Sequence, residues 1–356
     1  MTRRLTLALS LVVFATSCAD TEELLAPTTS LSSQAHADPP IERWTIRPDL
    51  TDPGIDVGLD DYIIRVPARG RNGRLFMFLP GSRVGPGTGE VVQAEAARLG
   101  YLVIGLSYPN DPGLVSFCGP APDPDACYET TRLEGITGED VSSFVTIDRA
   151  NSIDNRLTRL LEYLAANRPG DGWSQFLAGG EPKWAHIAVG GVSQGAGYAA
   201  MLAKMRRIDR AVMLSGVTDA IGGVAAAWVT PGVTPPGRLY GLVHQQDNQF
   251  RPGVLANWVA LGMDAFGGPV VPEASVPPYD GARMLITNVT PSNGSFAAPF
   301  PHASTGVDPF TPFTADGVPV LRPAWRYMLG YCPPPGRWDE GAGAGPAPVV
   351  PCQTDH

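Results

Sequence analysis

One serine in this chain stands in a setting that suits a nucleophile. Ser193 lies in the stretch GGVSQGAGYAA, residues 190–200, and its central pentapeptide GVSQG has the pattern G-x-S-x-G. An apolar run precedes the pentapeptide and a run of small residues with helical character follows it, so the serine is expected on a tight strand-to-helix turn. Glycines suit such a turn because the strained backbone at the serine brings neighbouring segments into near contact. The pattern favours a catalytic Ser193 over a merely polar residue in a Gly-rich turn.

A serine nucleophile needs a base to accept its proton, and the chain has five histidines. His36 lies in a segment without apolar periodicity, and His356 is the last residue. His186 begins the strand before the serine, which places it roughly 20 Å away at about 3.3 Å per residue. His244 and His302 remain as candidates. Both follow predicted strands and so belong to the carboxyl edge of a parallel sheet, where α/β active sites form.

The apolar strand, the GVSQG turn, the following helix and the downstream acid and histidine resemble the α/β-hydrolase superfamily. The likeness is strongest to its exported bacterial esterases and polyester-hydrolase-like members, and it covers roughly residues 75–329. The turn is the specific part of this resemblance, and the remainder is mostly pattern. The resemblance implies a catalytic triad in the chain order Ser, Asp or Glu, His.

Carried onto this sequence, the resemblance implies the triad Ser193, Asp247 and His302. His302 follows the last predicted strand, and Asp247 follows the strand before it, in the segment LVHQQDN. Asp219, in SGVTDA, is the alternative acid because some members of the superfamily place theirs after that earlier strand. For His244 we favour a structural or pocket-lining role.

Two backbone N–H groups are expected to stabilise the oxyanion of an acyl-transfer reaction. The turn points the Gln194 N–H, at a helix N-terminus, toward such a charge. The segment LPGSR, after the strand that begins at Leu75, resembles the Pro-Gly-x turn of many exported esterases. This resemblance implies that the Ser82 N–H is the second donor. Only backbone N–H groups are needed, so the Ser82 side chain carries no predicted role.

The composition argues against several other functions. The formal net charge of −9 gives no basic field for gathering phosphates, so nucleic acid is not an expected partner. The GPGTG run lacks the Lys-Ser/Thr pair of a nucleotide-binding loop. Asp123 and Asp125 alone are far short of a calcium ligand set. We expect no metal and no cofactor.

The N-terminus has the features of an export signal. Two arginines at positions 3 and 4 precede an apolar run over residues 5–14, and small residues lead to Cys18. The residues before Cys18 resemble the lipobox of bacterial lipoproteins, which implies a lipidated cysteine and a cell-envelope location, at the outer membrane or on a periplasmic face. Ordinary signal-peptide cleavage nearby, giving a periplasmic or secreted protein, is the alternative. The domain prediction is a signal peptide over 1–18, a flexible tether over 19–40 and a catalytic domain over 41–356.

Four further cysteines form an even set in an oxidising compartment, which allows three pairings. Sequence proximity favours Cys118 with Cys127 and Cys332 with Cys352, the second bridge tying down the C-terminal tail. A metal site is the competing interpretation, but neither pair has the close Cys and His spacing that zinc requires. We therefore predict two disulfides.

The predicted fold class is α/β, an α/β-hydrolase fold with a mostly parallel central sheet, helices on both faces and long Pro- and Gly-rich loops. Continuous apolar runs of strand length alternate with helical patterns through the body of the chain. The chain's 41 glycines and 36 prolines indicate many turns and long connections. The expected strands are residues 75–80, 101–109, 186–192, 211–217, 239–244 and 282–289, and the expected helices are 91–100, 153–164, 196–205 and 254–263.

These patterns predict an exported serine hydrolase that cleaves small-molecule or polymeric carboxylic esters through an acyl-enzyme, attached to a membrane only by a lipid anchor. A serine peptidase of the same fold and a non-catalytic cell-surface binding protein are the alternatives. The substrate pocket is expected between the insertion 118–148 and the loops 228–238 and 266–280, because Pro-rich connections at the carboxyl edge suit pocket walls.

Overall fold

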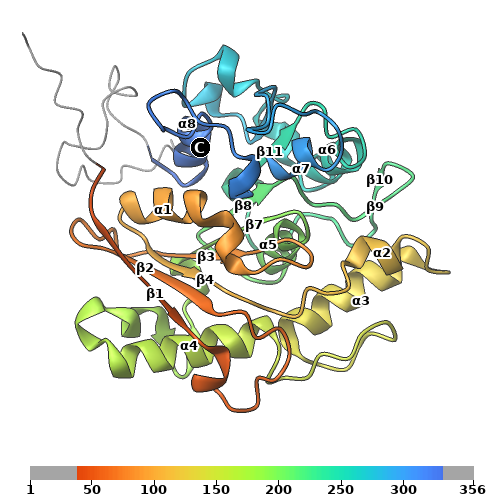
Figure 1. The fold of residues 1–356 in the computed structure, drawn as a ribbon. Coiled ribbons are helices and arrows are strands. Elements are labelled where there is room, and N and C mark those ends of the chain that lie inside the picture. The colour runs from red at the N-terminus through yellow and green to blue at the C-terminus, as the bar shows by residue number, and fades with distance from the viewer. Residues whose placement is uncertain (1–37, 332–356) are drawn as a thin grey trace, which may run out of the picture. The chain divides into compact units, whose positions relative to one another are not determined.

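A computed structural model of the protein describes residues 38–331 (Figure 1). Its centre is an eight-stranded sheet with the strand order β1-β2-β4-β3-β7-β8-β11-β12. The strands of this sheet are β1 (Ile41–Ile46), β2 (Tyr62–Pro67), β3 (Leu75–Leu79), β4 (Leu102–Gly105), β7 (Ile187–Val192), β8 (Arg210–Leu214), β11 (Leu239–His244) and β12 (Met284–Thr287). Two short hairpins stand apart from it, β5 (Leu177–Ala178) with β6 (Glu181–Pro182) and β9 (Ala220–Ile221) with β10 (Val224–Ala225).

The sheet is parallel from β4 to β12 and antiparallel at the β1 edge, where β2 pairs antiparallel with both β1 and β4. Every residue of β3, β7, β8 and β11 is buried. Parallel strands covered on both faces read as continuous apolar runs, which explains why the sequence shows them clearly. Strands β1 and β2 were not expected.

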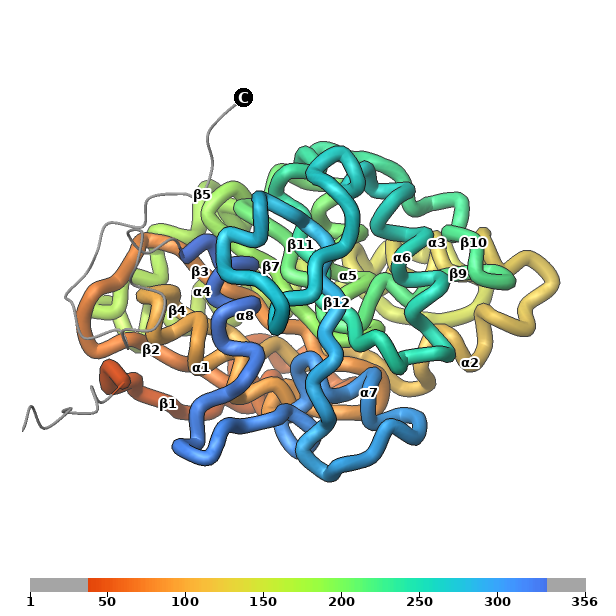
Figure 2. The backbone as a smooth tube through the Cα atoms, turned by 90° about the horizontal axis from the view of Figure 1, so that it is seen from above, coloured from red at the N-terminus to blue at the C-terminus, as the bar shows by residue number. Residues whose placement is uncertain are grey.

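Helices cover both faces of the sheet. They are α1 (Glu90–Arg98), α2 (Leu114–Cys118), α3 (Pro124–Thr137), α4 (Ile153–Asn167), α5 (Gln194–Met205), α6 (Arg251–Ala260), α7 (Phe300–Ala303) and α8 (Arg322–Met328). Alternate residues of β3 face opposite sides: Met77 belongs to the core shared with α3 to α6, and Phe76 to the core shared with α1 and α8. Helices α1 and α8 lie side by side on their face (Figure 2). This sheet with its surrounding helices is the predicted α/β-hydrolase fold.

Helix α3 lies within the insertion 118–148, where the sequence analysis predicted no helix. The Asp123 side chain caps this helix by accepting the Ala126 N–H at 3.0 Å, and Pro124 occupies its first turn. Proline is tolerated there because the N–H it lacks has no partner inside a helix. The helix ends at Gly138, which adopts a left-handed φ of 72°. Proline therefore marks the start of a helix here rather than a loop.

Several sequence predictions fall outside the described residues. These include the signal peptide, Cys18, nearly all of the tether and the Cys332–Cys352 bridge. Asp38, near the end of the predicted tether, pairs with Arg322 at 2.9 Å. Over residues 38–331, no helix is long and apolar enough to cross a membrane. Within that same range, no group of three or more His, Cys, Asp or Glu side chains is arranged to hold a metal ion.

Candidate active site

Ser193 occupies a strained turn between β7 and α5. Its backbone has φ 55° and ψ −115°, a conformation that non-glycine residues rarely adopt and that costs on the order of 1–3 kcal/mol. The Ser193 N–H donates to the Leu214 carbonyl at 2.8 Å, and the Ser193 carbonyl accepts from the Gly197 N–H at 3.3 Å. Ser193 is partly exposed between buried neighbours. The turn therefore presents the hydroxyl at the carboxyl edge of the sheet.

The two glycines of the pentapeptide are sterically required. A Cβ on Gly195 would lie 2.1 Å from the Leu79 carbonyl oxygen, and one on Gly191 would lie 2.5 Å from the Gly195 carbonyl carbon. Real Cβ atoms do not approach other atoms so closely. Glycine is therefore required at both positions of the G-x-S-x-G motif, because the turn packs closely on itself and against β3.

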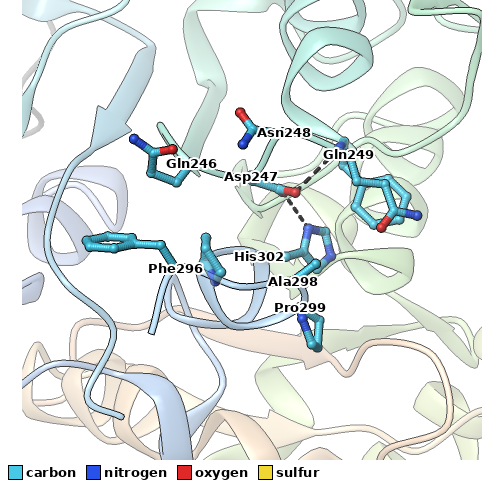
Figure 3. Close-up of a pocket in the computed structure, with 10 residues that line it drawn as sticks. Gln246, Asp247, Asn248, Gln249, Phe296, Ala298, Pro299 and His302 are labelled. Atoms are coloured by element: carbon cyan, nitrogen blue, oxygen red, sulfur yellow. Dashed lines mark hydrogen bonds and ion pairs between the residues drawn. The ribbon is translucent and has the colours of Figure 1, made fainter. Parts of the chain in front are cut away.

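His302 and Asp247 lie together beside β11. The His302 Nδ1–H donates to Asp247 Oδ2 at 2.6 Å, and the other Asp247 oxygen accepts from the Phe250 N–H at 3.3 Å (Figure 3). The Phe250 ring packs on the imidazole with 4.7 Å between ring centroids. A carboxylate on Nδ1 fixes the tautomer in which Nε2 is free to accept a proton. His302 stands in the short helix α7.

The segment that carries His302 is attached next to the serine turn. Thr305 Oγ1 and Ser215 Oγ are 2.8 Å apart, and Ser215 directly follows Leu214, whose carbonyl holds the Ser193 N–H. Helix α7 also contacts β11 (Figure 1). The serine turn and the histidine helix thus belong to the same carboxyl edge of the sheet.

Asp219 is committed to a different partner. Arg132 binds it through both oxygens, with Nε to Oδ2 at 2.5 Å and Nη2 to Oδ1 at 2.6 Å, and Trp228 Nε1 donates to Oδ2 at 3.0 Å. Both members of this ion pair are fully buried. The contacts therefore join Asp247, and not the alternative acid Asp219, to His302.

His244 is buried with both ring nitrogens occupied. Its Nε2–H donates to the Val289 carbonyl at 2.9 Å, and its Nδ1 accepts from the Gln246 N–H at 2.9 Å. Burial lowers the pKa of His244, because a charged imidazole loses its water there. These contacts fit the structural role favoured for it.

The depressed pKa of His244 predicts a pH dependence of stability. Around and below about pH 6.5 the unfolded chain binds a proton at this position more readily than the folded protein does, so stability is lost as the pH falls. His244→Gln is expected to reduce the slope of the free energy of unfolding between pH 7 and pH 5, measured by urea denaturation. The exposed His186 supplies the matched control, His186→Gln. An unchanged slope in the His244 variant would contradict the assignment.

The two residues predicted to supply the oxyanion donors, Ser82 and Gln194, contact each other through their side chains. The segment with Gly81 and Ser82 packs against the serine turn: a Cβ on Gly81 would touch Ser193 Cβ at 3.6 Å. The Ser82 hydroxyl donates to Gln194 Oε1 at 2.7 Å. The Ser82 side chain, to which the sequence assigned no role, thus has a specific partner across 112 positions of the chain.

A pocket opens beside His302 and differs from the one expected. Its walls come from the segment after β11 and the segment before α7, not from the insertion 118–148 or the loops 228–238 and 266–280 (Figure 3). Its lining joins carboxamide, aromatic and proline side chains: Gln246, Asp247, Asn248, Gln249, Phe250, Phe296, Ala298, Pro299, Pro301 and His302. Phe296 is 47% exposed, so one wall of the pocket is apolar and open to solvent. The sequence reasoning missed this wall because no local pattern pairs the two segments.

The Cys118–Cys127 disulfide is present, as predicted, with 5.3 Å between the Cα atoms. It joins the end of α2 to the start of α3, and both cysteines are buried. The bridge therefore links two helices beside the serine turn, since Leu114 of α2 and Arg132 of α3 both bond to Gln194.

Loss of this bridge is expected to affect both stability and catalysis. Replacing Cys118 and Cys127 by serine frees a loop with a sequence separation of 9, which costs roughly 3 kcal/mol in the chain-entropy account. Melting temperature and the KM values for a series of p-nitrophenyl esters should both change. The predicted Cys332–Cys352 bridge is the comparison, because its removal should lower the melting temperature with kinetics near normal. The assignment would be contradicted if removal of either bridge changed KM equally. A disulfide that joins a cysteine of one predicted pair to a cysteine of the other would also contradict it.

No family model matches the sequence, and none of the curated proteins compared with it matches. Among solved structures the chain is similar to a bacterial heroin esterase, with 13% identity, a TM-score of 0.35 and coverage of 72% of this chain and 77% of that one. It is also similar to a hyperthermophilic esterase from the archaeon Pyrobaculum calidifontis, with 15% identity, a TM-score of 0.27 and coverage of 50% and 46%.

Proposed function

We propose that the protein is a serine hydrolase that cleaves carboxylic esters through an acyl-enzyme. Ser193 is the nucleophile, His302 the general base and Asp247 the acid that orients it. The observation that carries the proposal is the 2.6 Å bond between His302 Nδ1 and Asp247 Oδ2, at the sheet edge where the strained Ser193 turn stands. An arrangement of nucleophile turn, base and orienting carboxylate has no use in a protein that only binds.

The proposed reaction proceeds in two half-reactions. Ser193 Oγ attacks the ester carbonyl while His302 Nε2 takes its proton, and the N–H groups of Gln194 and Ser82 hold the oxyanion. The tetrahedral intermediate expels the alcohol, which receives the proton from His302. Water then attacks the acyl-enzyme with His302 again as base, releasing the acid and restoring Ser193.

A fluorophosphonate probe tests the proposal directly. The folded protein should be labelled once per chain, and peptide mapping should place the label on Ser193. Absence of labelling would favour the binding protein. The peptidase alternative is tested by comparing p-nitrophenyl esters of rising acyl length with matched p-nitroanilides: we expect turnover of the esters, and faster turnover of the anilides would favour a peptidase.

We further propose that the protein is exported and lipidated at Cys18. The proposal rests on the arginines, apolar run and small residues before that cysteine, and the Cys118–Cys127 disulfide is in keeping with an oxidising compartment. Mass spectrometry of the mature protein should find a lipid-modified Cys18 as its first residue, with the protein partitioning into membranes. A first residue beyond Cys18 would assign the protein to the periplasm or the medium.

A further inference from the structure

We propose that the Gln194 carboxamide is a positioning group that aligns the two oxyanion donors, and that the disulfide-linked segment α2–α3 holds it in place. The inference rests on the proposed ester hydrolysis and adds a role for a side chain of that site. The proposed acyl transfer uses only the backbone N–H of Gln194.

The carboxamide oxygen of Gln194 joins two separate segments. Gln194 Oε1 accepts from the Ser82 hydroxyl at 2.7 Å and from the Leu114 N–H at 3.1 Å. Gln194 is only 2% exposed, so these bonds lie out of solvent. One atom thereby ties the Ser82 segment and the first residue of α2 to the first residue of α5.

The bonds to Ser82 and Leu114 determine which way the Gln194 amide is oriented and which atom accepts the Ser82 hydroxyl proton. A backbone N–H at Leu114 requires an acceptor, so a flipped amide would set donor against donor. Because Oε1 can only accept, the Ser82 hydroxyl must give its one proton to Gln194. That proton is then unavailable to an oxyanion, and Ser82 serves the oxyanion through its backbone N–H alone.

The main chain of Gln194 is held by the same segment. Arg132 Nη1 donates to the Gln194 carbonyl at 3.1 Å. The Nε and Nη2 atoms of the same guanidinium donate to Asp219. Arg132 belongs to α3 and Leu114 to α2, the two helices that the disulfide joins. Gln194 is thus held at its side chain by α2 and at its carbonyl by α3, the two helices that the disulfide joins.

There is little room for another arrangement at this contact. A Cβ on Gly113, just before α2, would lie 2.6 Å from Ser82 Oγ. The approach of α2 to the Ser82 segment therefore depends on the absence of a side chain there. Donors aligned in advance stabilise an oxyanion far better than donors that must move, and a displacement of about 1 Å can cost about 100-fold in rate.

The test compares Gln194→Met, Ser82→Ala and the double variant by three measurements. These are kcat, KM for a p-nitrophenyl ester, and the inhibition constant of a boronic acid that forms a tetrahedral adduct on serine. Gln194→Met should lower kcat by about 10- to 100-fold with KM within about twofold. The inhibition constant of the boronic acid should rise by a similar factor. Ser82→Ala should act in the same direction, and the double variant should be no worse than Gln194→Met, since both changes break the Ser82–Gln194 contact.

A buried carboxamide elsewhere controls for a general loss of packing. Gln93 accepts from Arg65 at 2.7 Å and donates to the Pro86 carbonyl at 2.6 Å, so Gln93→Met should lower the melting temperature and leave kcat near wild type. A wild-type kcat in Gln194→Met, or a double variant whose loss is the product of the single losses, would overturn the proposal. If Gln194→Met fails to fold, a wild-type kcat in Ser82→Ala overturns it. A wild-type protein that no fluorophosphonate labels would instead overturn the proposed function.

Discussion

Ser193→Ala is expected to abolish ester hydrolysis, with kcat falling by roughly six orders of magnitude. The hydroxyl supplies the attacking oxygen, and no neighbouring group replaces it in forming an acyl-enzyme. The fold should survive. The strained backbone already carries a Cβ at this position, and alanine removes only one partly exposed oxygen. Initial rates with p-nitrophenyl acetate, circular dichroism and thermal melting measure both parts of the prediction.

Ser174→Ala is the matched control, because this exposed serine lies in the connection before β5. It should keep wild-type kcat and react with the fluorophosphonate. A Ser193→Ala protein that retained even a tenth of the wild-type rate, after repurification to exclude contaminating esterases, would show that the nucleophile is another residue.

Those parts of the fold and site that depend on neighbours in the sequence could be predicted. The turn at Ser193 is one, because close contacts at Gly191 and Gly195 force the motif. Helix α4 is another: apolar residues at helical spacing follow Ser152, which caps it by accepting the Asn155 N–H. The central parallel strands were equally readable, since burial on both faces makes them continuously apolar.

What could not be predicted depends on pairs of residues that are distant in the sequence. Arg132 and Asp219 are 87 positions apart, and nothing in either local segment marks the ion pair. Ser82 can bond to Gln194 only because β3 and β7, the strands that precede these residues, are adjacent in the sheet. The pocket beside His302 likewise forms where two distant segments meet. These pairs are determined by tertiary packing, and local sequence propensity does not predict them.

Substitution of the two candidate triad acids, Asp247 and Asp219, should affect different properties of the protein: kcat for Asp247 and stability for Asp219. Asp247→Asn is expected to lower kcat by about 10⁴-fold with little change in the melting temperature. Its amide can no longer favour the Nδ1–H tautomer of His302 or stabilise the imidazolium that forms during attack. Asp219→Asn should keep kcat within about tenfold in the folded protein, because Asp219 does not contact the imidazole.

Asp219→Asn should instead reduce stability, by about 3 kcal/mol or more, since it removes the negative charge that compensates a fully buried guanidinium. Urea denaturation of both variants gives the stability change and the folded fraction, and kcat is taken per folded protein so that unfolded protein does not count. Lowering the pH cannot substitute for this comparison, because protonation acts on many carboxylates at once. If Asp219→Asn were the variant with the large loss of kcat per folded site and Asp247→Asn the mild one, the orienting carboxylate would be Asp219, and the 2.6 Å bond to His302 would have a structural role only.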